Sequence, residues 1–191
     1  MKSPLALSTL LAVCLTLMTG CATTQPQTKS NPARLRAMHV VTVADDFVVN
    51  VYHNGVRVPE AKRKLVLDRF GATIERTNIE VQQGDWLVFH VVNNRLRWGG
   101  AYYFSAAGVI ARGECGFVSD LTSGNWSACD SPAAADKFIT QKKYLSDHHA
   151  VAIERPWHEG TTLMKQQAGD NWNGAPIWGR ERSTWLKVIV P

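Results

Sequence analysis

The stretch FVVNVYHNGVRV, residues 47–58, decides the fold class. Valine and aromatic residues dominate its first half, as in a β-strand whose successive side chains point to opposite faces. The dipeptide Asn54-Gly55 follows at once, and these two residue types best tolerate the two positive φ angles of a type I′ turn. Residues 56–58 can then return antiparallel, so the stretch predicts a β-hairpin.

Segments of the same strand character follow one another along the chain and are separated by glycine-containing turns. They are residues 39–44, 64–67, 72–81, 86–92, 101–111, 151–154 and 185–190. Strands at this spacing, without a helical pattern between them, indicate a sandwich or a barrel. Only residues 131–146 interrupt the pattern, because Ser131 can cap a helix and Pro132 suits its first turn. We therefore expect an all-β, jelly-roll-like antiparallel β-sandwich with one short helix, packed through Phe138 and Ile139.

The composition suits one globular domain rather than a fibrous or disordered chain. The sequence has 191 residues, of which 45% are hydrophobic and 19% charged, with a net charge of +5. The basic residues are scattered singly among acids, which disfavours a nucleic-acid partner. The unusual feature is the number of Trp residues, which is 7, with six of them after residue 97. This clustering points to recognition more than to catalysis.

The first residues predict the compartment. An apolar stretch from Leu5 to Met18 has the length of a signal-peptide core and is too short to span a membrane. It runs into Leu17-Met18-Thr19-Gly20-Cys21, which resembles the lipobox of bacterial lipoproteins. The resemblance implies a signal peptide over residues 1–20 and lipidation of Cys21, the alternative being an ordinary cleaved signal with an incidental Cys. Ala22 in place of Asp implies sorting to the outer membrane.

A polar segment separates the predicted anchor from the domain. Residues 22–37 are rich in Thr, Gln, Ser, Asn and Pro and have almost no apolar content, as in a solvated tether. We therefore expect a lipidated Cys and flexible tether over residues 21–37 and a β-sandwich domain over residues 38–191.

Two cysteines remain in the predicted domain, because Cys14 leaves with the signal peptide and Cys21 carries lipid. Two cysteines in an oxidising compartment are expected to pair. A disulfide between Cys115 and Cys129 would close a loop of 15 residues, for which chain entropy predicts a stabilisation of roughly 3 kcal/mol. A metal or redox site is disfavoured because the chain has no Cys-x-x-Cys motif and no His within this loop.

Several short motifs carry a second resemblance. Ala44-Asp45-Asp46, the strand ending in Asn54-Gly55, the Gly84-Asp85-Trp86 entry into residues 87–94, and the Trp-containing residues 177–188 resemble the galactose-binding-domain-like β-sandwiches. This resemblance implies a jelly roll whose members usually bind glycans and often serve as accessory modules. Fold alone does not establish function.

Three loop segments combine the side chains that a sugar requires, namely planar amides and guanidinium groups for hydroxyl pairs and aromatic rings for the apolar sugar face. They are residues 93–103, 120–127 and the pair 157–160 and 170–179. The predicted ligand-binding residues are Trp98, Trp126, Arg97, Asn94, Tyr102, Asp120, Asn125 and Trp172. The structural alternative is that Trp98 covers the end of the sandwich, that Tyr102 or Tyr103 faces the core, and that Trp178 belongs to the core.

Metal and enzyme hypotheses have weaker support in the sequence. Candidate metal ligands occur at residues 147–149, Glu154 and residues 158–159. The two adjacent histidines would point to opposite faces of a strand, so no metal centre is predicted. A structural Ca²⁺ at Asp45-Asp46 or Asp170-Asn171 stays open. The chain has no Gly-x-Ser-x-Gly, phosphate loop or dinucleotide fingerprint, and we expect no cofactor.

The sequence thus predicts a non-catalytic, lipid-anchored cell-envelope protein that binds a glycan or polysaccharide through Trp-rich loops. The alternative is a structural or assembly lipoprotein that docks a partner protein through the same loops, since aromatic residues and Arg are enriched in both kinds of site.

Overall fold

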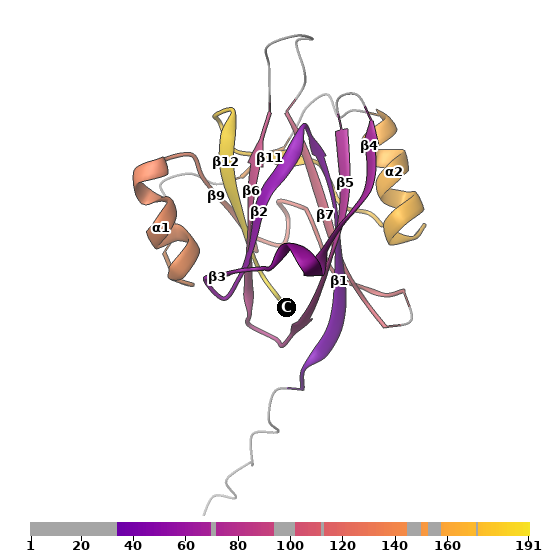
Figure 1. Ribbon diagram of the computed structural model, residues 1–191, viewed down its shortest axis with the longest axis horizontal. Coiled ribbons are helices and arrows are strands. Elements are labelled where there is room, and N and C mark those ends of the chain that lie inside the picture. The colour runs from indigo at the N-terminus through magenta and orange to yellow at the C-terminus, as the bar shows by residue number, and fades with distance from the viewer. Residues whose placement is uncertain are drawn as a thin grey trace, which may run out of the picture. The chain divides into compact units, whose positions relative to one another are not determined.

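Two antiparallel β-sheets form a sandwich in the computed structural model (Figure 1). The structure describes residues 34–69, 72–93, 102–111, 113–144, 150–152, 158–170 and 172–191. The predicted all-β sandwich is therefore confirmed. The predictions for residues 1–33 concern the signal peptide, Cys21 and most of the tether, all of which lie outside the described residues.

Sheet A has seven described strands in the order β10-β11-β7-β1-β5-β4, with β8 paired to β7. Their bounds are β1 Arg36–Asp45, β4 Arg63–Arg69, β5 Ala72–Val81, β7 Tyr103–Ile110, β8 Cys115–Val118, β10 Val151–Ala152 and β11 Ile177–Trp178. Sheet B has five, in the order β3-β2-β6-β12-β9. Their bounds are β2 Phe47–His53, β3 Val56–Arg57, β6 Trp86–Val92, β9 Trp126–Cys129 and β12 Ser183–Ile189. The strand β1 thus begins slightly before the predicted start of the domain at residue 38.

The β2–β3 hairpin forms as the sequence predicts. Asn54 and Gly55 have φ angles of 50° and 81°, which a type I′ turn requires. The Asn54 side chain donates to Asp85 Oδ1 at 2.8 Å and accepts from Trp86 N at 3.0 Å. Burial pushes the pKa of Asp85 upward, but hydrogen bonds from Asn54, Gln82 and His53 outweigh it and hold this pKa below its usual value. The turn is therefore fixed to the start of β6 by polar contacts.

Alternating side chains of both sheets meet in the central core. Strand β1 contributes Met38, Val40 and Ala44, and β6 contributes Leu87, Phe89 and Val91. All of these side chains are buried, so their burial supplies the main hydrophobic stabilisation of the sandwich. The opposite face of each sheet carries a cluster of its own.

Each outer cluster is covered by one helix, and Figure 1 shows the two helices on opposite sides of the sandwich. Helix α1, Pro132–Thr140, lies against β9 and β12 of sheet B. It packs through Phe138 and Ile139, which confirms that expectation. Helix α2, His158–Ala168, lies against β1 and β7 of sheet A.

Helix α2 corrects the expectation of a single helix. Residues 157–160 form part of a predicted loop segment, and Gly160, Thr161 and Thr162 are weak helix formers. Packing of Met164 and Ala168 on the outer face of sheet A overrides that propensity. Short strands were also missed at β8, β9 and β11, since two to four residues give too little alternation to recognise.

The predicted disulfide is wrong, because Cys115 and Cys129 are free. Cys115 lies on β8 and packs into the sheet A cluster under α2, whereas Cys129 lies on β9 in the sheet B cluster under α1. Packed sheets are about 10 Å apart, while a disulfide needs Cα atoms within about 7 Å. The loop between the two cysteines crosses from one sheet to the other, so its short length does not bring the thiols together.

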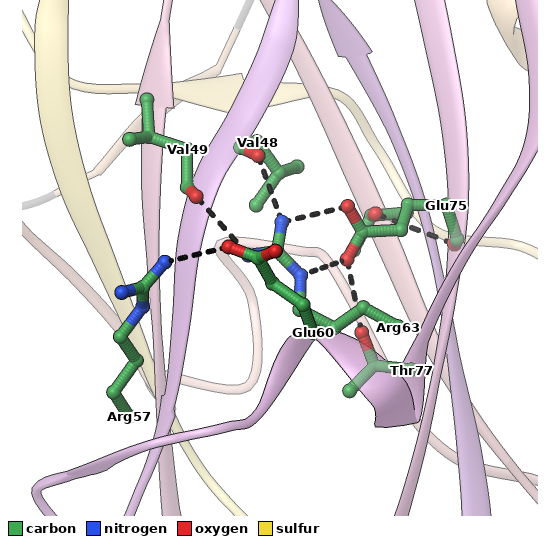
Figure 2. A network of polar contacts seen from close by, with 8 residues as sticks. Val48, Val49, Arg57, Glu60, Arg63, Glu75 and Thr77 are labelled. Carbon is green, nitrogen blue, oxygen red and sulfur yellow. Dashed lines mark hydrogen bonds and ion pairs between the residues drawn. The ribbon is translucent and has the colours of Figure 1, made fainter.

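A buried ion pair joins the sheets at the open edge (Figure 2). Arg63 of β4 contacts Glu75 of β5 through Nε at 2.6 Å and through Nη2 at 2.7 Å. The same guanidinium donates to the carbonyls of Val49 at 3.0 Å and Val48 at 2.8 Å, which lie on β2 at a shift of its register with β6. Arg63 therefore links sheet A to the backbone of sheet B.

Candidate functional site

The first predicted loop is only partly described. Trp98, Arg97 and Asn94 lie outside the described residues. Tyr102 is half-buried, and its ring lies 5.4 Å from that of Trp178. Trp178 is fully buried, in agreement with the core alternative for that residue.

Trp126 is not an exposed binding platform. Only 4% of its surface is exposed, and its indole Nε1 donates to the Val118 carbonyl at 2.9 Å. Its ring contacts Phe89 of sheet B and both Phe104 and Phe117 of sheet A. The prediction failed because Trp126 opens strand β9, whose pleat turns this side chain inward.

Asp120 and Asn125 organise their loop rather than meet Trp126 at a surface. The Asp120 carboxylate accepts from Ser123 N at 2.7 Å and from Thr122 Oγ1 at 3.1 Å. Burial raises the pKa of Asp120, but these hydrogen bonds outweigh it and lower the pKa overall. The backbone of Asn125 bonds to the Ser123 hydroxyl and to Ile189. The Asp120 carboxylate and the Asn125 backbone are thus used in turn formation.

Trp172 is also buried, with 3% of its surface exposed, in the cluster beneath α2. Its indole Nε1 finds no acceptor among the described residues. The assignment of Trp172 to an open binding loop is therefore wrong. Helix α2 ends nearby at Ala168 and brings the ring back onto the sheet.

The structure instead gathers aromatic and polar side chains on the outside of sheet B. We call this region the upper face of sheet B and define it by Phe47, Asn50, His90, Ser183 and Trp185. The registers place them together, since Asn50 pairs with His90, His90 with Trp185, and both Phe47 and Ser183 with Val92. Helix α1 packs on the same sheet over Val88, and the buried Trp185 belongs to the same cluster.

The centre of the upper face is a stack of two rings. The imidazole of His90 lies 4.3 Å from the indole of Trp185 at an interplanar angle of 10°. His90 Nε2 is 2.8 Å from the Ser183 hydroxyl. Burial lowers the pKa of His90, so its ring is neutral at pH 7 and has one donor and one acceptor nitrogen.

Two further residues of the upper face have a group that the described fold leaves without a partner or exposed. The side-chain oxygen of Asn50 is buried without a hydrogen-bond donor among the described residues. Phe47 leaves 42% of its surface exposed. The upper face therefore offers an apolar ring beside amide, imidazole and hydroxyl groups, the combination that suits the two sides of a sugar ring.

An acidic pair lies at the turn between β1 and β2, where Asp45 of β1 pairs with Tyr103 of sheet A. Burial raises the pKa of Asp45 to about 7, and a hydrogen bond and charge repulsion from Asp46 act in the same direction. The described residues contain no group of three or more His, Cys, Asp or Glu side chains that could hold a metal ion, and Asn171 of the other Ca²⁺ candidate is outside them. With this raised pKa, the Asp45 carboxyl holds a proton in part of the molecules near neutral pH, and the protonated carboxyl can both donate and accept a hydrogen bond.

Sequence reasoning missed the upper face because it searched loops. The available pattern was polar residues at outward positions of otherwise apolar strands, namely Asn50, His90 and Ser183. Their convergence depends on the pairing of β2, β6 and β12, which the sequence does not show.

No protein-family model, curated protein or solved structure matches this chain. Within the described residues, the helices are too short or too polar to cross a bilayer.

Proposed function

We propose that this protein is a lipid-anchored cell-envelope protein that binds a glycan or polysaccharide without turnover, through the upper face of sheet B. The observation that carries the proposal is the exposed ring of Phe47 on β2, whose strand pairs with the strand that carries His90. Aromatic rings on a rigid sheet need little ordering on binding, which favours recognition. The anchoring rests on the lipobox-like residues 17–21 and the outer membrane on Ala22.

The polar groups of the upper face support a sugar more than an apolar ligand. Asn50 and His90 lie on neighbouring strands at paired positions, so their side chains are spaced for adjacent hydroxyl groups. These groups would give orientation, and the Phe47 ring would give stacking.

A glycan array followed by calorimetric titration of the glycans retained tests this proposal. Phe47→Ala should weaken binding by about 1 to 3 kcal/mol, the scale known for base stacking on aromatic side chains, and His90→Ala should weaken it also. Val56→Ala is the control, because Val56 is an exposed apolar residue on β3 of the same sheet, away from the upper face.

Melting temperatures separate loss of binding from loss of folding. If both upper-face variants bind as tightly as Val56→Ala, this face is not the site. Loss of binding confined to Trp98→Ala would move the site to the loop at residues 93–103.

The second candidate function is docking of a partner protein. It is favoured by the edge strand β4, where Leu65 and Val66 are exposed, since sheet edges can accept a further strand. Cross-linked pull-down from solubilised envelopes, lost in Leu65→Lys and retained in Phe47→Ala, would support docking instead of glycan binding.

Anchoring has its own test. Cys21→Ser should abolish labelling by a palmitate analogue, because it removes the thiol that would carry the lipid. The unlipidated protein should be soluble or retained as precursor, since the polar residues 22–37 supply almost no membrane affinity. Labelling that persists in this variant would contradict lipidation at Cys21.

A further inference from the structure

A trough of about 640 Å³ lies on the outer face of sheet A. Its described lining comes from β1, β5, β7, the turn after β7 and the short helix η1, Glu60–Lys62. The volume is within the range of small-molecule sites. It lies on the opposite sheet from the upper face of sheet B, so it concerns a second site.

The strand registers arrange the trough as two rows. Asn78, His39 and Val109 lie side by side on β5, β1 and β7, and Glu80 lies beside Ala37 in the next row. Lys62 precedes Arg63, which pairs with Thr77, so Lys62 adjoins Asn78. Alanine and valine side chains form the floor, while His39, Lys62, Asn78 and Glu80 supply polar groups.

Lys62 supplies a positive charge to the lining of the trough, and a second positive charge, that of Arg76, lies beyond one end of the trough, outside its lining. Arg76 lies on the same face of β5 as Asn78, two positions away, and its Nη2 donates to Gln167 of α2 at 3.3 Å. Its Nε is buried without an acceptor among the described residues. In the described part of the chain, neither Arg76 nor Lys62 forms an ion pair with an acidic side chain.

The other end of the trough carries a negative charge. Glu80 lies two positions beyond Asn78 on β5, which is about 7 Å along a strand. Its carboxylate would repel a second anionic group but can accept from hydroxyls. His39 lies between the ends, and burial and then Arg76 lower its pKa, so it is a neutral hydrogen-bonding group at pH 7.

We infer that this trough binds a sugar-sized molecule carrying a single carboxylate or phosphate. The anionic group lies at Lys62, on the side of the trough nearer Arg76, and the hydroxyl groups bond to Asn78, His39 and Glu80. The floor of small side chains leaves room for the ring.

Calorimetric titration of the purified domain with glucuronate, glucose 6-phosphate and glucose tests the inference and separates the two anionic sources. At least one of the acids should bind about tenfold more tightly than neutral glucose. Lys62→Gln should weaken the binding of that acid by about tenfold, as expected for the loss of one hydrogen bond to a charged group. Lys142→Gln is the matched control, because it removes the same charge from an exposed lysine that does not line the trough.

A second variant fills the trough itself. Ala111 is exposed and lines the trough, so Ala111→Trp should abolish acid binding and leave the melting temperature unchanged. Equal binding of glucose and both acids, an equal effect of Lys62→Gln and Lys142→Gln, or no binding of either acid would overturn the inference. Phe47→Ala should leave acid binding intact, which separates this site from the proposed glycan face.

Discussion

Arg63 shows how a single residue can hold a charge in the interior of the sandwich. Its side chain is 9% exposed and that of Glu75 is 13% exposed, so both charges have lost most of their hydration. Two contacts to the Glu75 carboxylate and two backbone carbonyls of β2 replace the lost water. A buried pair of this kind adds little net stability by itself, but removing one partner leaves the other charge buried without a counterion.

Glu75→Gln should therefore lower the free energy of unfolding by about 3 to 5 kcal/mol, because the Arg63 charge stays buried without its counterion. Urea denaturation measures the change. Glu60→Gln is the control, since it removes the same charge from the Arg57–Glu60 pair, whose carboxylate is 82% exposed (Figure 2), and should cost less than about 1 kcal/mol. Equal costs for the two variants would refute a special role for the buried pair.

The two cysteines make a second prediction at this scale. Cys115 donates to the Ala168 carbonyl and Cys129 to that of Ser131, and burial raises the pKa of both thiols. Iodoacetamide without reductant should modify both thiols in denaturant and neither quickly in the native protein. Reductant should leave the melting temperature unchanged. Thiols that react only after reduction would show a disulfide after all.

At the scale of elements, hydrogen bonds from sheet B hold helix α1 in place, one from the Trp86 indole to Ile139 and two from Lys187. Lys187 of β12 donates from Nζ to the carbonyls of Gln141 and Tyr144, both at 3.0 Å, just beyond the helix. The same Nζ lies 4.1 Å from the centre of the Phe138 ring. Burial lowers the pKa of Lys187 to about 8 from its ordinary 10.5.

This lowered pKa makes stability depend on pH. Below about pH 8 both states hold the proton, and the cost of burying the charge is constant. Between the two pKa values the unfolded chain binds the proton and the folded chain does not, so the stability of the protein rises with pH. The gain is complete above the unfolded value.

Urea denaturation of the wild type and Lys187→Met from pH 7 to pH 10 tests this. Above pH 8, the free energy of unfolding of the wild type should rise relative to that of Lys187→Met, by at most about 1.4 kcal/mol per pH unit. Taking the difference is necessary because the buried thiols act in the opposite direction as they lose their protons. A difference that is flat with pH would contradict the lowered pKa.

Elements with strong local patterns could be predicted, and short elements could not. The hairpin at Asn54-Gly55 and the helix after Ser131 follow from turn and capping chemistry that acts within a few residues. Helix α2 begins with weak helix formers, and its position depends on the apolar face of sheet A beneath Met164. Strands β8 and β9 are four residues each. Strand β9 is supported by pairing with β12, far along the chain, and β8 by pairing with β7 at a shift of register.

At the scale of the whole molecule, Trp126 ties the sheets together. It contacts Phe89 on one sheet and Phe104 and Phe117 on the other, with ring centroids 6.1 to 6.2 Å apart. Its environment is therefore that of a core residue.

Trp126→Ala should lower the free energy of unfolding by about 3 to 5 kcal/mol, through lost burial and the cavity left between the sheets. Thermal and urea unfolding of the intact protein measure this loss. Phe47→Ala, which truncates an aromatic residue that is 42% exposed, should cost much less. If Trp126→Ala were as stable as the wild type, the burial of Trp126 in the core would be contradicted.

The sequence by itself determined the all-β class, the first hairpin and helix α1, because alternation, turn preference and capping are local properties of the chain. The tertiary structure alone decided that Cys115 and Cys129 lie on opposite outer faces and that Trp126 and Trp172 are buried. It also decided that Asn50, His90 and Ser183 converge on one face. These outcomes depend on which strands pair and in which register, and that choice is made by contacts between residues far apart in the chain.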